Sequence, residues 1–216
     1  DVKSLFGEGY TAVPATGTVW STVWDDVGNP VDVSLSGGNV VKKYTGVNFI
    51  GIEPNSTLNV SDMDTFHIDV WRTDATADLK IKLVDFGADG AYGGVAAAAD
   101  VEHEVAFNTT KGNAVGANQW VGLDIPLSQF TGLTTKDHLA QLIISSHKYD
   151  GNGKPVGSGE NLWVDNVYFS KSATPVVPTS GPSAPTKLQA DVKSLFSDSY
   201  TAVPATGTVW STVWDD

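Results

Sequence analysis

The sequence predicts an all-β sandwich. Helical periodicity is nearly absent, and short alternating or apolar runs recur between clusters of Gly, Asn, Asp and Pro. Turn sequences such as Gly28-Asn29-Pro30 and Gly37-Gly38-Asn39 separate these runs. Short strands with turn signals at close intervals are typical of two packed antiparallel sheets.

Each run has the length and the composition of a strand. In chain order, the predicted strands are residues 2–6, 17–24, 31–35, 40–44, 47–52, 65–73, 78–86, 101–107, 119–127, 140–147 and 161–169. Residues 127–130, which follow Pro126, are expected to form one turn of helix.

Alternation assigns side chains to the two faces of a strand, because successive side chains point in opposite directions. One face of the stretch 66–72 is apolar and is expected in the core: Phe66, Ile68 and Val70. The other face combines an imidazole, a carboxylate and an indole: His67, Asp69 and Trp71. The stretch 141–149 alternates in the same way. Its inward residues are Leu142 and Ile144, and its outward residues include Gln141, His147 and Tyr149.

The chain repeats its own beginning. Residues 1–26 recur as residues 191–216, an offset of 190 (191 − 1), and only positions 7, 8 and 9 differ from 197, 198 and 199. A period of this length corresponds to one domain plus a linker. We therefore predict a module at 1–171, a Pro/Ser/Thr-rich, semi-rigid linker at 172–190 and the truncated start of a second copy at 191–216.

A 26-residue copy cannot bury a core of its own. We expect one copy to dock where the other would sit, in the same chain or in a strand-swapped dimer, because exchange of identical elements is a low-cost route to dimers. The alternative, in which the tail only packs against a neighbouring molecule, stays open.

The composition excludes several classes of partner. A net charge of −12 and a pI near 4.5 repel nucleic acids, anionic lipid surfaces and acidic polysaccharides. The chain has no cysteine, so neither a disulfide framework nor thiol chemistry is expected. No stretch approaches the roughly 20 apolar residues of a membrane span.

Tryptophans are the first candidates for ligand contact. An indole offers a flat apolar surface that can stack on the C–H face of a pyranose ring, and an N–H for a hydroxyl group. Trp71 lies on the polar, outward face of its strand and is expected to contact a ligand. Trp120 directly precedes the inward residues of its strand, and a packing role is expected. Trp24 and Trp163 fit either role.

The sequence gives little indication of a zinc site or a catalytic site. The spacing of the histidines fits no zinc site: His67, His103, His138 and His147. Glu102 and Glu104 share the outward face of one strand and could serve as the two carboxylates of a glycosidase. Outward Glu pairs on an acidic protein are more often a solvated surface, which is the preferred interpretation.

Two Gly-rich loops, at 85–90 and 150–154, space oxygen ligands as calcium loops do. Neither matches the full EF-hand pattern, and both are expected to be turns. The Gly-rich run 87–94, which contains Tyr92, is long enough to overhang a binding face.

Several segments, in their order along the chain, resemble a known family. They are residues 20–26, 43–44 with 48–53, 120–127 (WVGLDIPL) and 162–169 (LWVDNVYF). Their order resembles the non-catalytic carbohydrate-binding modules of marine bacterial laminarinase-type multimodular proteins. More widely, residues 1–169 resemble the galactose-binding-like jelly-roll modules.

The resemblance implies a calcium-supported β-sandwich that binds a soluble polysaccharide. In related modules, an Asp of the last strand binds a structural calcium together with oxygens of the first strand and its turn. That role maps onto Asp165, with Ser4 and Glu8 as further ligands. Position 8 stays acidic in the second copy, as Asp198.

We therefore expect a carbohydrate-binding module, without enzymatic activity, of a secreted or cell-surface multimodular protein. Its expected ligand is a neutral polysaccharide, foremost a β-1,3-glucan such as laminarin, and tandem copies would add avidity. Stacking is assigned to Trp71 or Trp24. The further contact residues are His67, Asp69, Gln141, His147, Tyr149 and Tyr92. The alternative is a structural or adhesin repeat that contacts other proteins.

Overall fold

The structure is a computed structural model that describes residues 1–172, 183–196 and 199–201. The chain divides into two compact units, Asp1–Ala173 and Thr174–Asp216. Much of the predicted linker (173–182) and most of the predicted second copy (197–198 and 202–216) lie outside the described residues. The strands assigned in the described part all belong to the first unit.

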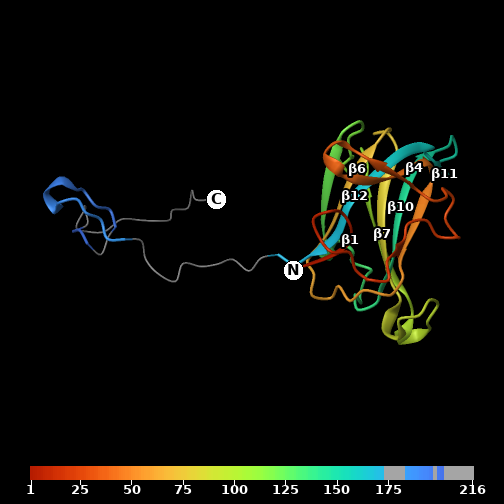
Figure 1. The fold of residues 1–216 in the computed structure, drawn as a ribbon, viewed down its shortest axis with the longest axis horizontal. Helices are drawn as coiled ribbons and strands as arrows, with labels where there is room; N and C mark the ends of the chain where they lie inside the picture. Colours follow the sequence, from red (N-terminus) through yellow and green to blue (C-terminus); the bar gives the residue numbers. More distant parts are fainter. Residues whose placement is uncertain (173–182, 197–198, 202–216) are drawn as a thin grey trace. The chain divides into compact units, whose positions relative to one another are not determined.

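The first unit is a sandwich of two antiparallel sheets, as predicted. The first sheet has the order β3-β4-β12-β6-β9, with β1 also paired to β12. Its strands are β1 (Val2–Phe6), β3 (Val31–Ser34), β4 (Val40–Val47), β6 (Thr65–Arg72), β9 (Trp120–Pro126) and β12 (Glu160–Ser170). Figure 1 shows β4, β12 and β6 as neighbours.

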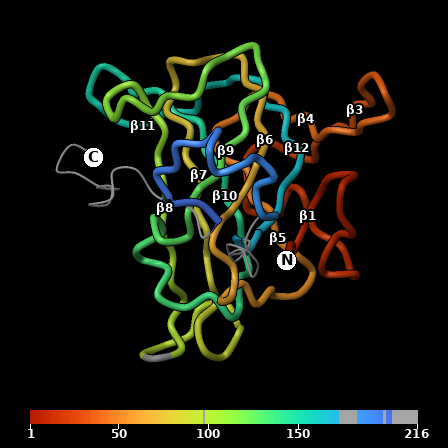
Figure 2. The backbone as a smooth tube through the Cα atoms, turned by 90° about the vertical axis from the view of Figure 1, so that its left-hand side faces the viewer, coloured from red at the N-terminus to blue at the C-terminus, as the bar shows by residue number. Residues whose placement is uncertain are grey.

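The second sheet has the order β2-β5-β10-β7-β8, with β11 paired to β10. Its strands are β2 (Thr18–Val19), β5 (Phe49–Pro54), β7 (Asp78–Asp85), β8 (Val101–Phe107), β10 (Leu139–Tyr149) and β11 (Pro155–Gly157). Figure 2 shows β7, β8 and β10 running together. Short 3₁₀ helices interrupt the loops: η1 (Ser36–Gly38), η2 (Gly87–Asp89), η3 (Ala96–Ala98), η4 (Leu127–Gln129) and η5 (Gln189–Asp191).

Each predicted strand overlaps an observed one, and η4 confirms the predicted helical turn. The largest error is the stretch 17–24, in which only Thr18–Val19 is a strand. The residues that follow form a loop, because the Asp25 carboxylate accepts the backbone N–H groups of Thr22 (3.1 Å) and Gly51 (3.2 Å). The short edge strand β11 was not predicted.

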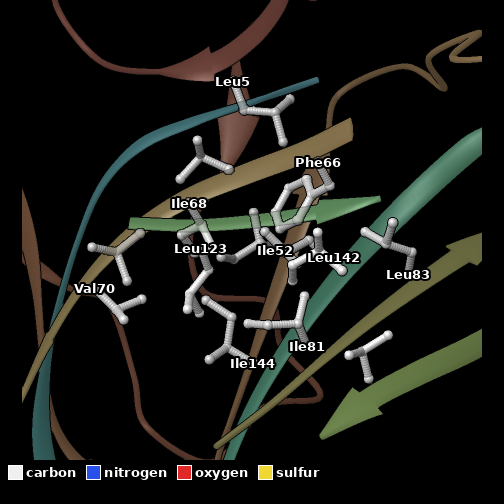
Figure 3. Close-up of a cluster of buried hydrophobic side chains, with 14 of the residues drawn as sticks. Leu5, Ile52, Phe66, Ile68, Val70, Ile81, Leu83, Leu123, Leu142 and Ile144 are labelled. Carbon is white, nitrogen blue, oxygen red and sulfur yellow. The ribbon is translucent and has the colours of Figure 1, made fainter. Parts of the chain in front are cut away.

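The core lies between the sheets and confirms the alternation read from the sequence. Phe66, Ile68 and Val70 of β6 are completely buried, and Figure 3 shows them packed against side chains of the opposite sheet. Those side chains include Ile81, Leu83, Leu142 and Ile144. Burying each such side chain stabilises the fold by roughly 1.5–3 kcal/mol.

A buried ion pair fixes the register of β6 against β12. Arg72 Nη2 lies 2.7 Å from Glu160 Oε1, and both side chains are buried. Arg72 also donates to the carbonyl of Ala77 (2.9 Å), while Glu160 accepts the backbone N–H of Asp74 (2.9 Å). Such a pair holds its geometry because either charge alone would be costly to bury.

Candidate functional site

A groove crosses the outer face of the second sheet. It has a volume of about 910 Å³. Its lining comes from β5, β7, β8, β10 and the loops at 20–30 and 86–100: Trp24, Glu53, Val84, Phe86, Tyr92, Asp100, Glu102, Gln141 and Ile143. Aromatic side chains therefore stand at both sides of a floor that mixes apolar and hydrogen-bonding groups.

Trp24 forms one wall of the groove. A side chain at Gly51 would place its Cβ 2.3 Å from the Trp24 ring, so only glycine lets the indole rest directly on β5. The ring also stacks parallel to Phe49, with 6.3 Å between centroids and an interplanar angle of 11°. Trp24 keeps 37% of its surface exposed, which leaves a fixed aromatic platform open to a ligand.

Two consecutive carboxylates hold the loop that carries Trp24. Asp25 accepts the hydroxyl of Ser21 (3.0 Å) in addition to the backbone N–H groups already described. Asp26 accepts the N–H of Phe49 (3.1 Å) and the side-chain amide of Asn48. These bonds attach the loop to β5 and replace the strand pairing that the sequence predicts there.

The floor carries a connected polar group. Glu53 Oε1 accepts hydrogen bonds from Gln141 Nε2 (2.6 Å) and from Trp24 Nε1 (3.2 Å). Within the described residues, Glu53 Oε2 and Gln141 Oε1 accept no hydrogen bond. Two oriented acceptors therefore lie beside the indole, where sugar hydroxyls could donate to them.

The opposite wall is a loop anchored at the end of β7. Phe86 and Tyr92 contact each other edge to face at 5.8 Å, and Tyr92 is 80% exposed. Asp100 accepts the N–H of Gly93 (3.0 Å) and so fixes the Gly-rich run. The run was predicted to overhang a binding face, and Tyr92 lines the groove.

The loop 85–90 is a turn, as predicted. Asp85 is completely buried and accepts three hydrogen bonds, from Gly87 N–H (3.0 Å), the Thr135 hydroxyl (2.7 Å) and His138 N–H (2.7 Å). The loop at 150–154 is also a turn, because Asp150 accepts N–H groups of its own loop.

The predicted contact residues do not form one site. Trp24, Gln141 and Tyr92 line the groove, whereas His67, Asp69 and Trp71 lie on the outer face of the first sheet. The two faces lie on opposite sides of the sandwich, so one sugar ring cannot contact both sets. The structure therefore divides the predicted contact residues between two faces.

His147 and Tyr149 lie on the outer face of β10 but are not part of the groove lining. The Tyr149 hydroxyl donates to Asp78 (3.0 Å). Burial lowers the pKa of His147, and the charge of Lys80 lowers it further. Both residues therefore lie at the other end of β10, away from the groove.

The packing role predicted for Trp120 is also wrong. Val121 and Leu123 point toward the core, so Trp120, directly before them, points outward and is 38% exposed. Glu102 and Glu104 pair with Lys82 (2.9 Å) and Lys80 (3.0 Å), in keeping with their interpretation as surface carboxylates.

Sequence reasoning did not single out Glu53, Phe86 or Asp100 as groove residues. Glu53 ends the segment 48–53 that contributed to the family resemblance. It lies two residues after Gly51 and so on the same, outward face of the strand, which is the sequence feature that could have indicated it. Phe86 and Asp100 flank the Gly-rich run, and only the folded loop brings them together.

The oxygens suggested for calcium lie where β12 changes partners. Val164 pairs with β4 and Val167 with β1, so Asp165 sits between the two pairings. Asp165 accepts hydrogen bonds from Asn39 Nδ2 (3.0 Å) and from the N–H of Asn166 (2.7 Å).

The chemistry of this position partly fits a calcium ion. Burial raises the pKa of Asp165, and the nearby charges of Glu8 and Asp69 raise it further. Asn39 Oδ1 is buried without a hydrogen-bond partner. Ser4 donates to the carbonyl of Phe6 (3.3 Å). No three His, Asp or Glu side chains cluster as a metal site in the part of the chain that the structure describes, so amide oxygens would be needed.

No protein family matches the sequence, and no curated protein is similar enough to be recognised as a relative. Solved structures share its fold. A family 30 carbohydrate-binding module is 14% identical, with a TM-score of 0.51 over 84% of this chain and 93% of that chain. The family 30 module of the cellulosomal cellulase Cel9D-Cel44B of Clostridium thermocellum is also 14% identical, with a TM-score of 0.51 over 81% and 99%. At this identity the likeness shows the β-sandwich fold. None of the described helices is long and apolar enough to cross a membrane.

Proposed function

We propose that this chain is a non-catalytic carbohydrate-binding module that holds a neutral polysaccharide in the groove of the second sheet. The observation that carries the proposal is the fixed Trp24 platform, whose N–H and floor partner Gln141 both bond to Glu53. An aromatic ring beside oriented acceptors suits a sugar ring, which has an apolar face and a rim of hydroxyl donors. The likeness in fold to carbohydrate-binding modules supports the same function.

The charges around the groove favour a neutral ligand. Glu53, Asp100 and Glu102 all line it, and the chain carries a net charge of −12. Sulfate or uronate groups would be repelled there, whereas hydroxyl groups can donate to the carboxylates. We propose a β-glucan, foremost a β-1,3-glucan such as laminarin, in the setting of a secreted or cell-surface multimodular protein.

The test is affinity electrophoresis of the full chain in gels that contain laminarin, mixed-linkage glucan, alginate or agarose. We expect retardation by a neutral glucan, and a weaker effect in Trp24→Ala. The matched control is Val23→Ala, a fully exposed neighbour in the same loop. Retardation by none of these glycans would contradict the proposal and favour the structural or adhesin repeat, which the recurrence of residues 1–26 also suits.

We further propose a structural calcium ion at Asp165, with oxygens of Glu8 and Asn39 as partners. The buried carboxylate with its raised pKa and the unpartnered Asn39 oxygen support it. The hydroxyl of Ser4, the third residue suggested by the resemblance, donates to a backbone carbonyl instead and is a weaker candidate.

A strand-swapped dimer remains a proposal as well. Residues 1–6 supply β1, which pairs with β12, and residues 191–196 have the same sequence, DVKSLF. The second copy could therefore supply β1 to another chain. A monomeric mass of the full chain in solution at high concentration would contradict this.

A further inference from the structure

Three tryptophans lie in one row on the outer face of the first sheet. Trp71 of β6 is directly opposite Trp163 of β12 on one side and Trp120 of β9 on the other. We call these three residues the tryptophan row. Directly paired residues of antiparallel strands point to the same face, and the strands are about 4.8 Å apart. The row therefore places three indoles side by side on neighbouring strands.

The core does not need these rings. The neighbouring residues Val70 and Leu162 already fill the inner side of the sheet and are completely buried. Trp71 and Trp120 contact each other edge to face, with 6.1 Å between centroids, and the ammonium of Lys43 lies 5.1 Å from the Trp163 ring. A row of large apolar side chains on the solvent side of a sheet is typical of a binding surface.

A group of polar side chains follows the row along the same face. His67 Nδ1 lies 2.7 Å from Asp124 Oδ1, and His67 Nε2 lies 3.4 Å from Asp69 Oδ1. Between these groups, β9 carries Gly122 opposite Asp69. A Cβ on Gly122 would lie 3.0 Å from Asp69 Oδ1, so the glycine leaves the carboxylate accessible from above.

A second aromatic group lies beyond these polar side chains. The ring of Tyr168, which pairs with His67 across the strands, stacks on the imidazole at 4.5 Å and 16°. Tyr10 contacts Tyr168 edge to face at 5.5 Å and is 51% exposed. The face therefore has aromatic surfaces at both ends and hydrogen-bonding groups between them.

We propose that this face is a second glycan-binding surface, separate from the groove, and that its ligand is also a neutral polysaccharide. Indoles suit the C–H faces of sugar rings, and the carboxylates of the half-buried Asp69 and the exposed Asp124 can accept hydrogen bonds from hydroxyls. The same carboxylates repel uronates and sulfates. The choice of ligand class rests on the proposed function, but the surface itself is independent of the groove.

Two sites on opposite sheets would allow the module to bind two glycan chains at once. A long glycan chain can occupy the groove while a second chain lies on the tryptophan row. The module would then join polysaccharide chains, and a chain that reached both faces would bind with added avidity.

The test is calorimetric titration of the full chain with laminarin and mixed-linkage glucan oligosaccharides. Its variants are Trp24→Ala for the groove, Trp120→Ala for the row, and the double variant. We expect each single variant to lose about half of the bound ligand per chain and the double variant to lose all of it. Asp124→Ala, which is 74% exposed and distant from the core, serves as a second variant of the row face. Thermal unfolding of each variant checks that it folds.

The outcomes separate the two proposals. Full loss of binding in Trp24→Ala, with Trp120→Ala and Asp124→Ala unchanged, would overturn the second surface and leave the groove in place. Full loss in Trp120→Ala, with Trp24→Ala unchanged, would overturn the groove and assign the glycan to the row face alone. No binding by the wild-type chain would overturn both and leave contact with another protein as the use of these faces.

Discussion

Gln141 donates a hydrogen bond of 2.6 Å to Glu53 across the pairing of β10 with β5. The same carboxylate oxygen accepts the Trp24 N–H, so one group connects the wall of the groove to its floor. These two hydrogen bonds fix the orientation of the Gln141 and Trp24 side chains before any ligand binds. Groups that are ordered in advance lose less conformational entropy on binding.

The first prediction concerns this carboxylate. Glu53→Ala removes the acceptor of both donors, whereas Glu53→Gln keeps an acceptor oxygen in place. We expect Glu53→Ala to weaken glucan binding by roughly 10- to 100-fold, since hydrogen bonds to charged groups contribute about 1.5–3 kcal/mol. Glu53→Gln should lose less.

Calorimetry measures the affinities. The matched control is Glu104→Ala, which removes a carboxylate from the same sheet face, outside the groove lining. Equal losses in Glu53→Ala and Glu104→Ala would show that the effect comes from net charge and would contradict the assigned role.

The strands and the core were predictable from local pattern. Alternation in β6 places Phe66 inward and His67 outward because a strand has a period of two, and this holds wherever one face is buried. The loop that carries Trp24 was not predictable. Its backbone is held by Asp25 through partners up to 26 residues away, which no local period reveals.

The grouping of site residues also depends on tertiary structure. The sequence suggests a ligand-contacting indole at both Trp71 and Trp24. Only the strand order shows that they lie on opposite sheets. The row of Trp163, Trp71 and Trp120 requires the pairings β12–β6 and β6–β9. Those strands are far apart in sequence, so their register cannot be read from it.

The second prediction concerns the buried pair. Arg72→Met leaves Glu160 buried without its cation, and we expect a loss of about 3–5 kcal/mol in the free energy of unfolding. The double variant Arg72→Met/Glu160→Met removes both charges and should lose clearly less. Urea unfolding measures both. A loss in Arg72→Met no larger than in the surface variant Lys148→Met would contradict the role of the pair.

The third prediction concerns calcium. Addition of calcium to chelator-treated protein should raise the melting temperature. Binding to the folded state alone contributes about 2.7 kcal/mol at a hundredfold excess over Kd. A change of 1 kcal/mol shifts Tm by roughly 2–4 °C for a domain of this size.

Asp165→Asn should abolish the calcium effect. In the absence of calcium, the same variant should be no less stable than wild type at neutral pH, because burial raises the pKa of the carboxyl and disfavours its charge. Asp62→Asn, which removes an exposed carboxylate near Lys3, is the matched control. An equal Tm rise in Asp165→Asn and wild type would place the ion elsewhere or rule it out.

The fourth prediction is a pH dependence that originates at His147. Its Nδ1 is buried without a partner, and burial together with Lys80 lowers its pKa. The carboxylates of Glu104, Asp26 and Asp78 oppose this shift without cancelling it. The folded state therefore keeps the ring neutral at pH values where the unfolded chain already takes up a proton.

The sign follows from linkage. The contribution of His147 to stability is complete above the ordinary histidine pKa of about 6.5 and falls as the pH drops from there to the lower pKa of the folded state. His147→Gln cannot titrate, so its free energy of unfolding should decrease less over this range than that of wild type. Urea unfolding of both proteins at several pH values between about 7.5 and 5.5 measures these free energies. Their difference isolates His147, because the other histidines contribute equally in both proteins. Parallel pH profiles for the two proteins would show that protonation of His147 is equally favourable in both states, contrary to its buried position.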